Sequence, residues 1–284
     1  MRDRRGSGEW AAARPRSPAL IDVLIPTVGR VAELAVTLAG LAAQDAPSFR
    51  VMVSDQSDEG LTNAPAVQAM ARVLRAQGRE VTMLRHLPRR GLAEHRQFLL
   101  EHATADALLF LDDDVWLEPG ALSCLHEALT ELACGFVGMA VQGLSYLDDE
   151  RPAERTAFET WDGPVSPERI RRGTPAFDRW PLHNAANLAH LARDVPLGPR
   201  GWLAYKVAWI GACVLYRRSA LTDAGGFAFW SELPPEHAGE DVAAQWRVME
   251  RSGGAGILPS GAVHLEAPTT ITRRDIDAFD VVVR

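Results

Sequence analysis

The chain has 284 residues, of which 47% are hydrophobic and 24% charged, with a formal net charge of −7. Such a chain can bury one large core, and its acidic balance argues against a nucleic-acid partner, which would need a clustered basic surface. Its three cysteines form no CxxC pair, which indicates neither a disulfide framework nor a thiolate metal site and fits a reducing cytoplasm.

Residues 1–18 are rich in arginine and lack the apolar stretch of a signal peptide, so their composition predicts a disordered tail. No later segment approaches about 18 consecutive apolar residues, so we expect no integral membrane segment. We therefore expect a cytoplasmic protein in which residues 19–284 form a single folded domain.

From residue 20 onward, buried-strand patterns alternate with helical patterns. Strands are predicted at 20–27, 49–54, 81–84 and 107–111, and helices at 31–44, 64–77 and 92–102. This alternation predicts an α/β fold with a doubly wound, mostly parallel sheet that binds its ligands at the carboxyl edge. Three of the strands end in polar residues, which this topology would gather at that edge.

The pattern changes in the second half of the chain. Residues 143–205 are rich in Pro, Arg and Trp without clear periodicity, and we assign them to the substrate side rather than to the core. Ordered structure is expected again in the apolar run 207–216, in a helix that begins near Glu240, and in two short strands at 256–258 and 262–265. That helix would place Val242, Trp246 and Met249 on one face.

The predicted strand at 107–111 ends abruptly in Asp112, Asp113 and Asp114. Three adjacent carboxylates at the mouth of a sheet repel one another unless a positive group binds them. Hard divalent cations such as Mg²⁺ and Mn²⁺ take oxygen ligands from one or two protein carboxylates together with substrate phosphates. The cluster therefore indicates a metal bound with a nucleotide, although acidic residues also occur at helix starts without any ligand.

Several motifs follow one another in order along the chain. They are PT-x-x-R at 26–30, Ser-Asp at 54–55, LDDD at 111–114, GACVLYRRSAL-x-x-x-GGF at 211–227, GED at 239–241 and a late His264. This order resembles family 2 of the nucleotide-sugar glycosyltransferases, whose members have the GT-A fold. The resemblance implies transfer of a sugar from a nucleotide-sugar to a saccharide, peptide or small-molecule acceptor, with residues 19–142 binding the nucleotide and 143–284 the acceptor.

The resemblance also implies roles for individual residues. Asp114 and His264 correspond to ligands of Mn²⁺ or Mg²⁺. Residues that correspond to the nucleotide pocket are Pro26, Thr27, Arg30, Asp55, Gly91, Arg96, Asp112 and Asp113. A carboxylate such as Asp55 accepts the ring N–H of uracil or of guanine, so UDP is favoured only by its frequency in the family. Gln97 departs from the family's usual Asn, and Ala243 from a frequent Asp.

Asp241 corresponds to the family's catalytic base, and Glu240 would orient the acceptor or its neighbour. At the beginning of a helix, Asp241 would be kept ionised near neutral pH by the helix dipole. It would take the acceptor's proton as the bond to the nucleotide breaks, with inversion at the anomeric carbon. The tryptophans at 161, 180, 202, 209 and 230 could stack on an acceptor ring, and His237 could contact the donor.

Three alternatives stay open at this point. A retaining transferase of the same fold would use Asp241 and Glu240 only to position groups. A phosphotransferase with an Asp nucleophile would fit Asp112 and Asp114, although Trp116 stands where such enzymes usually have a small hydroxyl or branched residue. A catalytically silent nucleotide- or saccharide-binding protein would need the same cavity without turnover.

Overall fold

A computed structural model describes residues 6–12, 18–183, 185–271 and 274–283 of the chain. The strands are β1 (Ile21–Thr27), β2 (Phe49–Asp55), β3 (Val81–Arg85), β4 (Ala107–Leu111), β5 (Val115–Leu117), β6 (Phe136–Gly138), β7 (Leu203–Tyr205), β8 (Cys213–Arg217), β9 (Gly254–Leu258) and β10 (Ala262–His264). The α-helices are α1 (Ser7–Ala11), α2 (Val31–Ala42), α3 (Pro65–Ala76), α4 (Leu92–His102), α5 (Ala121–Leu132), α6 (Ala185–Asp194), α7 (Arg218–Asp223), α8 (Glu240–Ser252) and α9 (Ala278–Val282). Short 3-10 helices occupy Leu61–Asn63, Leu144–Tyr146, Pro152–Arg155, Phe177–His183 and Ala228–Glu232.

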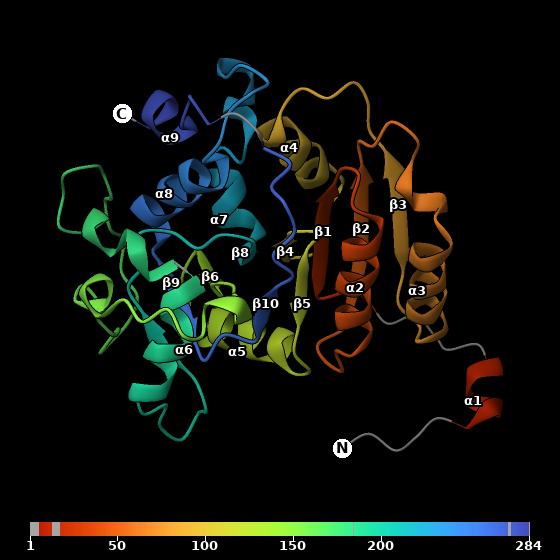
Figure 1. The fold of residues 1–284 in the computed structure, drawn as a ribbon, viewed down its shortest axis with the longest axis horizontal. Coiled ribbons are helices and arrows are strands. Elements are labelled where there is room, and N and C mark those ends of the chain that lie inside the picture. Colours follow the sequence, from red (N-terminus) through yellow and green to blue (C-terminus); the bar gives the residue numbers. More distant parts are fainter. Residues whose placement is uncertain (1–5, 13–17, 184, 272–273, 284) are drawn as a thin grey trace.

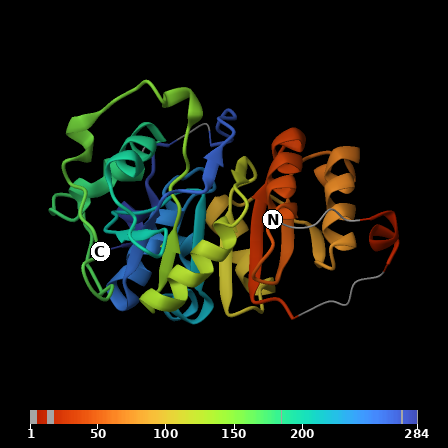
Figure 2. The same cartoon turned by 90° about the horizontal axis from the view of Figure 1, so that it is seen from below.

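An eight-stranded sheet in the order β3-β2-β1-β4-β8-β6-β9-β7 runs through the molecule (Figure 1). Strands β3, β2, β1 and β4 are all parallel, as the alternation of strands and helices predicts. Thr27 is paired with Asp55, so the polar ends of β1 and β2 lie side by side at the carboxyl edge. The N-terminal half and the C-terminal half lie on opposite sides of the view in Figure 2.

Both faces of the sheet are covered, which explains the continuous apolar runs in its strands. In β1, Ile21, Val23 and Ile25 face a core built with α2, α3 and α5. Leu24, on the other face, belongs to a second core that includes residues of α4, α7 and α8. The predicted doubly wound α/β fold is therefore confirmed.

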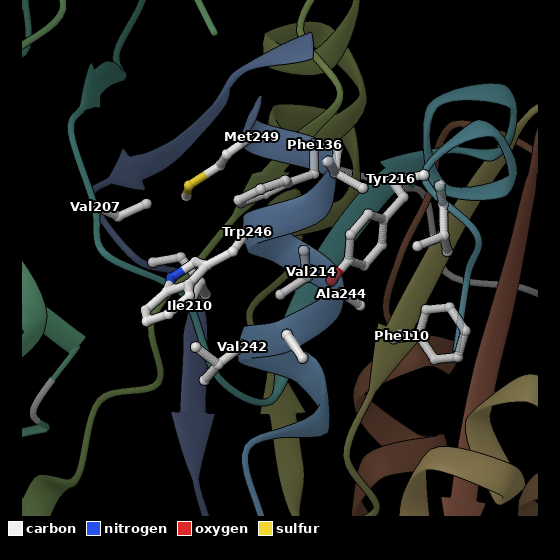
Figure 3. Packing of buried hydrophobic residues seen from close by; sticks show 14 of the residues in the cluster. Phe110, Phe136, Val207, Ile210, Val214, Tyr216, Val242, Ala244, Trp246 and Met249 are labelled. Carbon is white, nitrogen blue, oxygen red and sulfur yellow. The ribbon is translucent and has the colours of Figure 1, made fainter. Parts of the chain in front are cut away.

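Helix α8 packs its apolar face against the second half of the sheet. Val242, Trp246 and Met249 are all buried, as their spacing predicts. Figure 3 shows these side chains among those of neighbouring strands and loops, including Phe136 and Tyr216. This packing fixes the start of α8, where Glu240 and Asp241 lie.

The apolar run 207–216 is ordered, and its end belongs to β8. Before that strand, Gln245 of α8 accepts the Ile210 N–H at 2.8 Å and donates to the Ile210 carbonyl at 2.7 Å. These bonds replace a sheet ladder. The segment 143–205 is not confined to the substrate side, since Ile170, Leu182 and Tyr205 are buried in the core.

The predicted disordered tail at 1–18 stays a prediction. Residues 1–5 and 13–17 lie outside the described residues, and between them α1 has no buried residue. Among the described helices, none combines the length and the apolar character that crossing a membrane requires.

Candidate functional site

A cavity of about 290 Å³ opens at the carboxyl edge of the sheet, and we call it the acidic cavity. Its walls are the end of β1, the Asp112–Asp114 turn after β4, His264 of β10 and part of the C-terminal segment. The residues that line it are Pro26, Thr27, Val28, Arg30, Leu92, His95, Asp112, Asp113, Asp114, His264, Ala267, Thr269, Thr270, Ile271 and Arg274. The parallel topology thus gathers most of the predicted nucleotide pocket in one place.

Arg96 links the Asp112–Asp114 turn, which we call the acidic turn, to the start of α8. Its Nη2 donates to Asp112 Oδ1 at 2.9 Å, and its Nε donates to Glu240 Oε1 at 3.0 Å. Burial lowers the pKa of Arg96, but Asp112, Glu240 and Asp241 outweigh it and raise the pKa above its ordinary value. Arg96 therefore stays charged and holds the two motifs together instead of lining the acidic cavity.

Arg30 neutralises the other two carboxylates of the turn. Its Nη1 lies 2.9 Å from Asp113 Oδ1 and 2.7 Å from Asp114 Oδ2. Asp113 also accepts a 2.6 Å hydrogen bond from Thr27 Oγ1. Burial raises the pKa of Asp113 to about 6, although these bonds from Thr27 and Arg30 lower it. Two arginines thus supply part of the positive charge that the sequence analysis assigned to a metal ion.

His264 reaches the turn because β10 pairs with β5, opposing His264 to Val115. Its Nε2 lies 3.4 Å from Asp114 Oδ2. Its Nδ1 accepts the N–H of Glu266 at 2.9 Å, so the neutral ring carries its proton on Nε2. In this arrangement His264 directs a proton, not a lone pair, toward Asp114.

The donor set suits a hard divalent cation only in part. Among the described residues, no three His, Cys, Asp or Glu side chains form a metal-binding group. Mg²⁺ is often held by one or two protein carboxylates while substrate phosphates complete its shell. The pair formed by Asp114 and Asp112 at one cavity wall fits a cation of that kind. His264 could join only after its Nε2 loses the proton and Glu266 N–H moves away.

Asp55, which the resemblance assigns to the nucleobase, lies at the end of β2. It is fully buried and does not line the acidic cavity. Its Oδ1 accepts the N–H of Ser57 at 2.8 Å, and its Oδ2 accepts the N–H of Leu61 at 2.7 Å. Asp55 therefore shapes the loop after β2, and its expected contact with a base stays a prediction.

A second cavity of about 400 Å³ adjoins the first, and we call it the amide cavity. Its lining residues are Val28, Gln56, Arg89, Gly91, Leu92, His95, Pro235, Glu236, His237, Thr270 and Ile271. Five of these also line the acidic cavity. The two cavities therefore form one continuous cleft. Gly91 lines only the part that the amide cavity forms.

Sequence reasoning missed His95 and Gln56, which both line this cleft. Burial and the neighbouring His86 lower the pKa of His95 to about 3, so its imidazole is neutral. His95 Nε2 lies 2.8 Å from Ser54 Oγ, at the end of β2. The position of His95 directly before Arg96 on α4 was the available signal.

Asp241 lies in a third cavity, of about 520 Å³, which we call the aromatic cavity. Its lining residues are Arg172, Phe177, Trp180, His183, Trp209, Ala238, Gly239, Asp241, Val242, Arg274, Asp277 and Phe279. Burial and the charge of Glu240 raise the pKa of Asp241 to about 7. Burial and Glu240 therefore oppose the ionisation of Asp241 that its place at the start of α8 predicts.

The five tryptophans of the second half do not share one site. Trp180 and Trp209 line the aromatic cavity with Asp241. Trp161 and Trp202 line a separate cavity that contains no residue of the acidic turn, and Trp230 packs against the core. Only the first two are placed to contact a molecule beside Asp241.

The arrangement is that of an α/β protein with an acidic cleft at the carboxyl edge of its sheet and a carboxylate in a further cavity. A family model described as glycosyl transferase family 2 matches residues 22–191. The chain therefore belongs to glycosyl transferase family 2, which confirms the resemblance. A pre-mycofactocin glycosyltransferase from Mycobacterium tuberculosis is 26% identical over 171 residues, covering 60% of this chain and 29% of that protein.

Solved structures show the same fold. The mannosyltransferase PcManGT from Pyrobaculum calidifontis, in complex with GDP-Man and Mn²⁺, has a TM-score of 0.53 and 17% identity, covering 93% of this chain and 64% of that one. TarS 1–349 from S. aureus has a TM-score of 0.52 and 15% identity, covering 85% of this chain and 59% of that one. Its complex with UDP-GlcNAc has a TM-score of 0.50 and 16% identity, covering 88% and 60%. The chain thus spans less than two thirds of each of these proteins, and the likeness confirms the GT-A-like fold.

Proposed function

We propose that the chain transfers a sugar from a nucleotide-sugar to an acceptor hydroxyl. The observation that carries this proposal is the presence of two cavities of different chemistry whose linings share Arg274. With a divalent cation bound, the acidic cavity would take the diphosphate of a nucleotide, and the aromatic cavity holds Asp241. Arg274 lines both cavities, so a donor and an acceptor would meet next to Asp241.

The donor would lie in the cleft formed by the acidic and amide cavities. Family membership supports a nucleotide-sugar, and one structure of the same fold carries GDP-Man with Mn²⁺. Asp114 with Asp112 would hold Mn²⁺ or Mg²⁺ next to the diphosphate. When bound, the cation would stabilise the negative charge of the departing nucleoside diphosphate.

Asp241 would act as the general base. Its pKa is raised to about 7, and a general base is most effective when its pKa lies close to the working pH. The acceptor oxygen would form a bond to the anomeric carbon as the bond from that carbon to the diphosphate breaks. The hydroxyl proton would pass to Asp241, and attack from the side opposite the diphosphate would invert the anomeric centre.

Glu240 has a different role in this proposal. It is 2% exposed and is bound to Arg96, so it does not face an acceptor. Through Arg96 it would fix the position of α8 relative to Asp112. We therefore treat Glu240 as a positioning residue rather than as a catalytic one.

Two variants test the assignment. Asp114→Ala should abolish Mn²⁺-dependent binding of the donor in calorimetry, whereas Asp241→Asn should keep donor binding and lose transfer. Transfer by the Asn variant at the native rate would refute Asp241 as the base. NMR of the product's anomeric configuration separates inversion from retention. Donor binding without turnover, whichever acceptor is added, would favour a catalytically silent binding protein.

A further inference from the structure

Gln56 is a buried side chain with an unused donor. It directly follows β2, lines the amide cavity and is 3% exposed. Its Nε2 is buried and has no hydrogen-bond partner among the described residues. Since buried polar groups in native proteins are nearly always hydrogen-bonded, an unpaired amide nitrogen at a cavity wall calls for an acceptor from outside the chain.

The backbone of Gln56 is held by two hydrogen bonds, whereas its side-chain carboxamide can rotate. Its N–H donates to the Thr27 carbonyl at 3.0 Å, and its carbonyl accepts from Arg89 Nε at 2.7 Å. The terminal torsion of a Gln side chain is broad. Rotation of the carboxamide would therefore turn Nε2 toward the cavity without breaking a hydrogen bond that Nε2 makes.

The amide cavity lies where the base of the proposed donor nucleotide would be. It continues from the acidic cavity, where the diphosphate of the proposed donor would lie. Val28, Leu92 and Ile271 provide apolar walls for the faces of a flat ring, while Gln56 provides a polar group for its edge. Asp55, the expected partner of the base, has both carboxylate oxygens bound to backbone N–H groups.

We propose that Gln56 selects the nucleobase, its Nε2 donating a hydrogen bond to the ring carbonyl oxygen of uracil or guanine. This inference rests on the proposed nucleotide-sugar donor and goes beyond it by naming the residue that reads the base. Cytosine and adenine carry an amino group where uracil and guanine carry O4 and O6. An amino group would oppose its own N–H donors to the Gln56 donor, so these bases are disfavoured.

The test measures binding of UDP, CDP, GDP and ADP to the full chain with Mn²⁺ by calorimetry. The native chain should prefer UDP to CDP, or GDP to ADP, by about tenfold or more. Gln56→Leu should reduce this preference to within about threefold, and Gln56→Glu, which replaces the donor by an acceptor, should favour the amino base. Gln68→Glu on α3 makes the same charge change outside both cavities and should keep the native preference.

Inorganic pyrophosphate with Mn²⁺ serves as a probe without a base. Its affinity should be equal in the native chain and in both Gln56 variants, which shows that the acidic cavity is intact. A keto preference that survives in both variants would overturn the role of Gln56 alone. Failure of the native chain to bind any of the four nucleotides would overturn the nucleotide donor as well.

Discussion

Arg96 of α4 donates a hydrogen bond to Glu240 of α8 over 3.0 Å, joining residues 144 positions apart in the chain. The two side chains are 4% and 2% exposed. A buried ion pair of this kind contributes little net stability, but loss of one partner leaves a charge without compensation. The contact therefore makes the α4–α8 packing depend on both residues.

Arg96→Met should lower the free energy of unfolding by about 3–5 kcal/mol, because Glu240 would keep a buried charge without a partner. Urea denaturation measures this loss. The double variant Arg96→Met with Glu240→Met should recover much of it. Arg200→Met, which removes an exposed partner of Glu131, should cost at most about 1 kcal/mol. Equal losses for Arg96→Met and Arg200→Met would contradict the buried pair.

Much of this architecture is predictable from the sequence, for a physical reason. β1 and β4 are buried on both faces, so their residues form the continuous apolar runs that the sequence shows. The apolar spacing of Val242, Trp246 and Met249 likewise predicts one face of α8. Such local patterns report burial directly.

Contacts between distant segments were not predictable in the same way. The pairing of Arg96 with Glu240 depends on how α4 and α8 pack, and the neutral state of His95 depends on its burial. The loop after β2 uses both oxygens of Asp55, which no spacing rule reveals. The resemblance located the cleft, but the side chains that face it follow from tertiary packing.

Arg30 would compete with a metal ion for Asp114, since its Nη1 lies 2.7 Å from Asp114 Oδ2. Arg30→Met should therefore strengthen binding of Mn²⁺ alone by about tenfold, equivalent to about 1.4 kcal/mol. Mn²⁺ binding is followed by electron paramagnetic resonance without nucleotide. Arg85→Met, whose partner is Asp55, serves as the control and should leave Mn²⁺ affinity unchanged. Weaker Mn²⁺ binding by Arg30→Met would contradict this competition.

If Asp241 is the base, as we propose, its pKa sets the pH dependence of transfer. Because a base acts in its ionised form and burial and Glu240 raise this pKa to about 7, kcat/KM should rise with pH up to about 7 and level off above it. Glu240→Gln should move this limb to lower pH, since the charge of Glu240 raises the pKa of Asp241. Asp223→Asn on α7 should leave the limb in place. A flat profile from pH 5 to pH 8 would argue against Asp241.

The same pKa predicts a stability change that needs no substrate. An unfolded Asp ionises near pH 4, whereas Asp241 in the folded chain ionises near pH 7. The native chain should therefore lose stability as the pH rises from about 4 to 7. Asp241→Asn lacks this loss, so its thermal midpoint relative to the native chain should increase over that range. A constant difference between the two midpoints would show that the pKa is not raised.

Trp180 would contact the proposed acceptor, because it lines the aromatic cavity and is 43% exposed. Trp180→Ala should raise the KM for the acceptor roughly 2- to 10-fold, the range expected for loss of one aromatic contact. Its KM for the donor should not change. Trp10, 44% exposed on α1, provides a control of matched exposure, and Trp10→Ala should alter neither constant. A change in donor KM alone would place the acceptor elsewhere.

Gly91 is required by both its backbone and its surroundings. It precedes α4 with φ of +102°, and a Cβ there would lie 2.6 Å from His237 Cε1 and 2.8 Å from the Pro235 carbonyl oxygen. The His237 ring is held in place, because it accepts a hydrogen bond from the Ala93 N–H and donates one to the Pro234 carbonyl. Gly91→Ala should therefore cost about 2–4 kcal/mol of stability, from backbone strain and overpacking together.

Gly29→Ala separates these two causes. Gly29 also has a positive φ, +73°, but a Cβ there would meet no atom within 4 Å. This variant should lose only about 1–2 kcal/mol, the cost of the backbone conformation itself. Urea denaturation compares the two. Equal losses would show that His237 yields to the added methyl group, and the amide cavity would then be more deformable than its hydrogen bonds indicate.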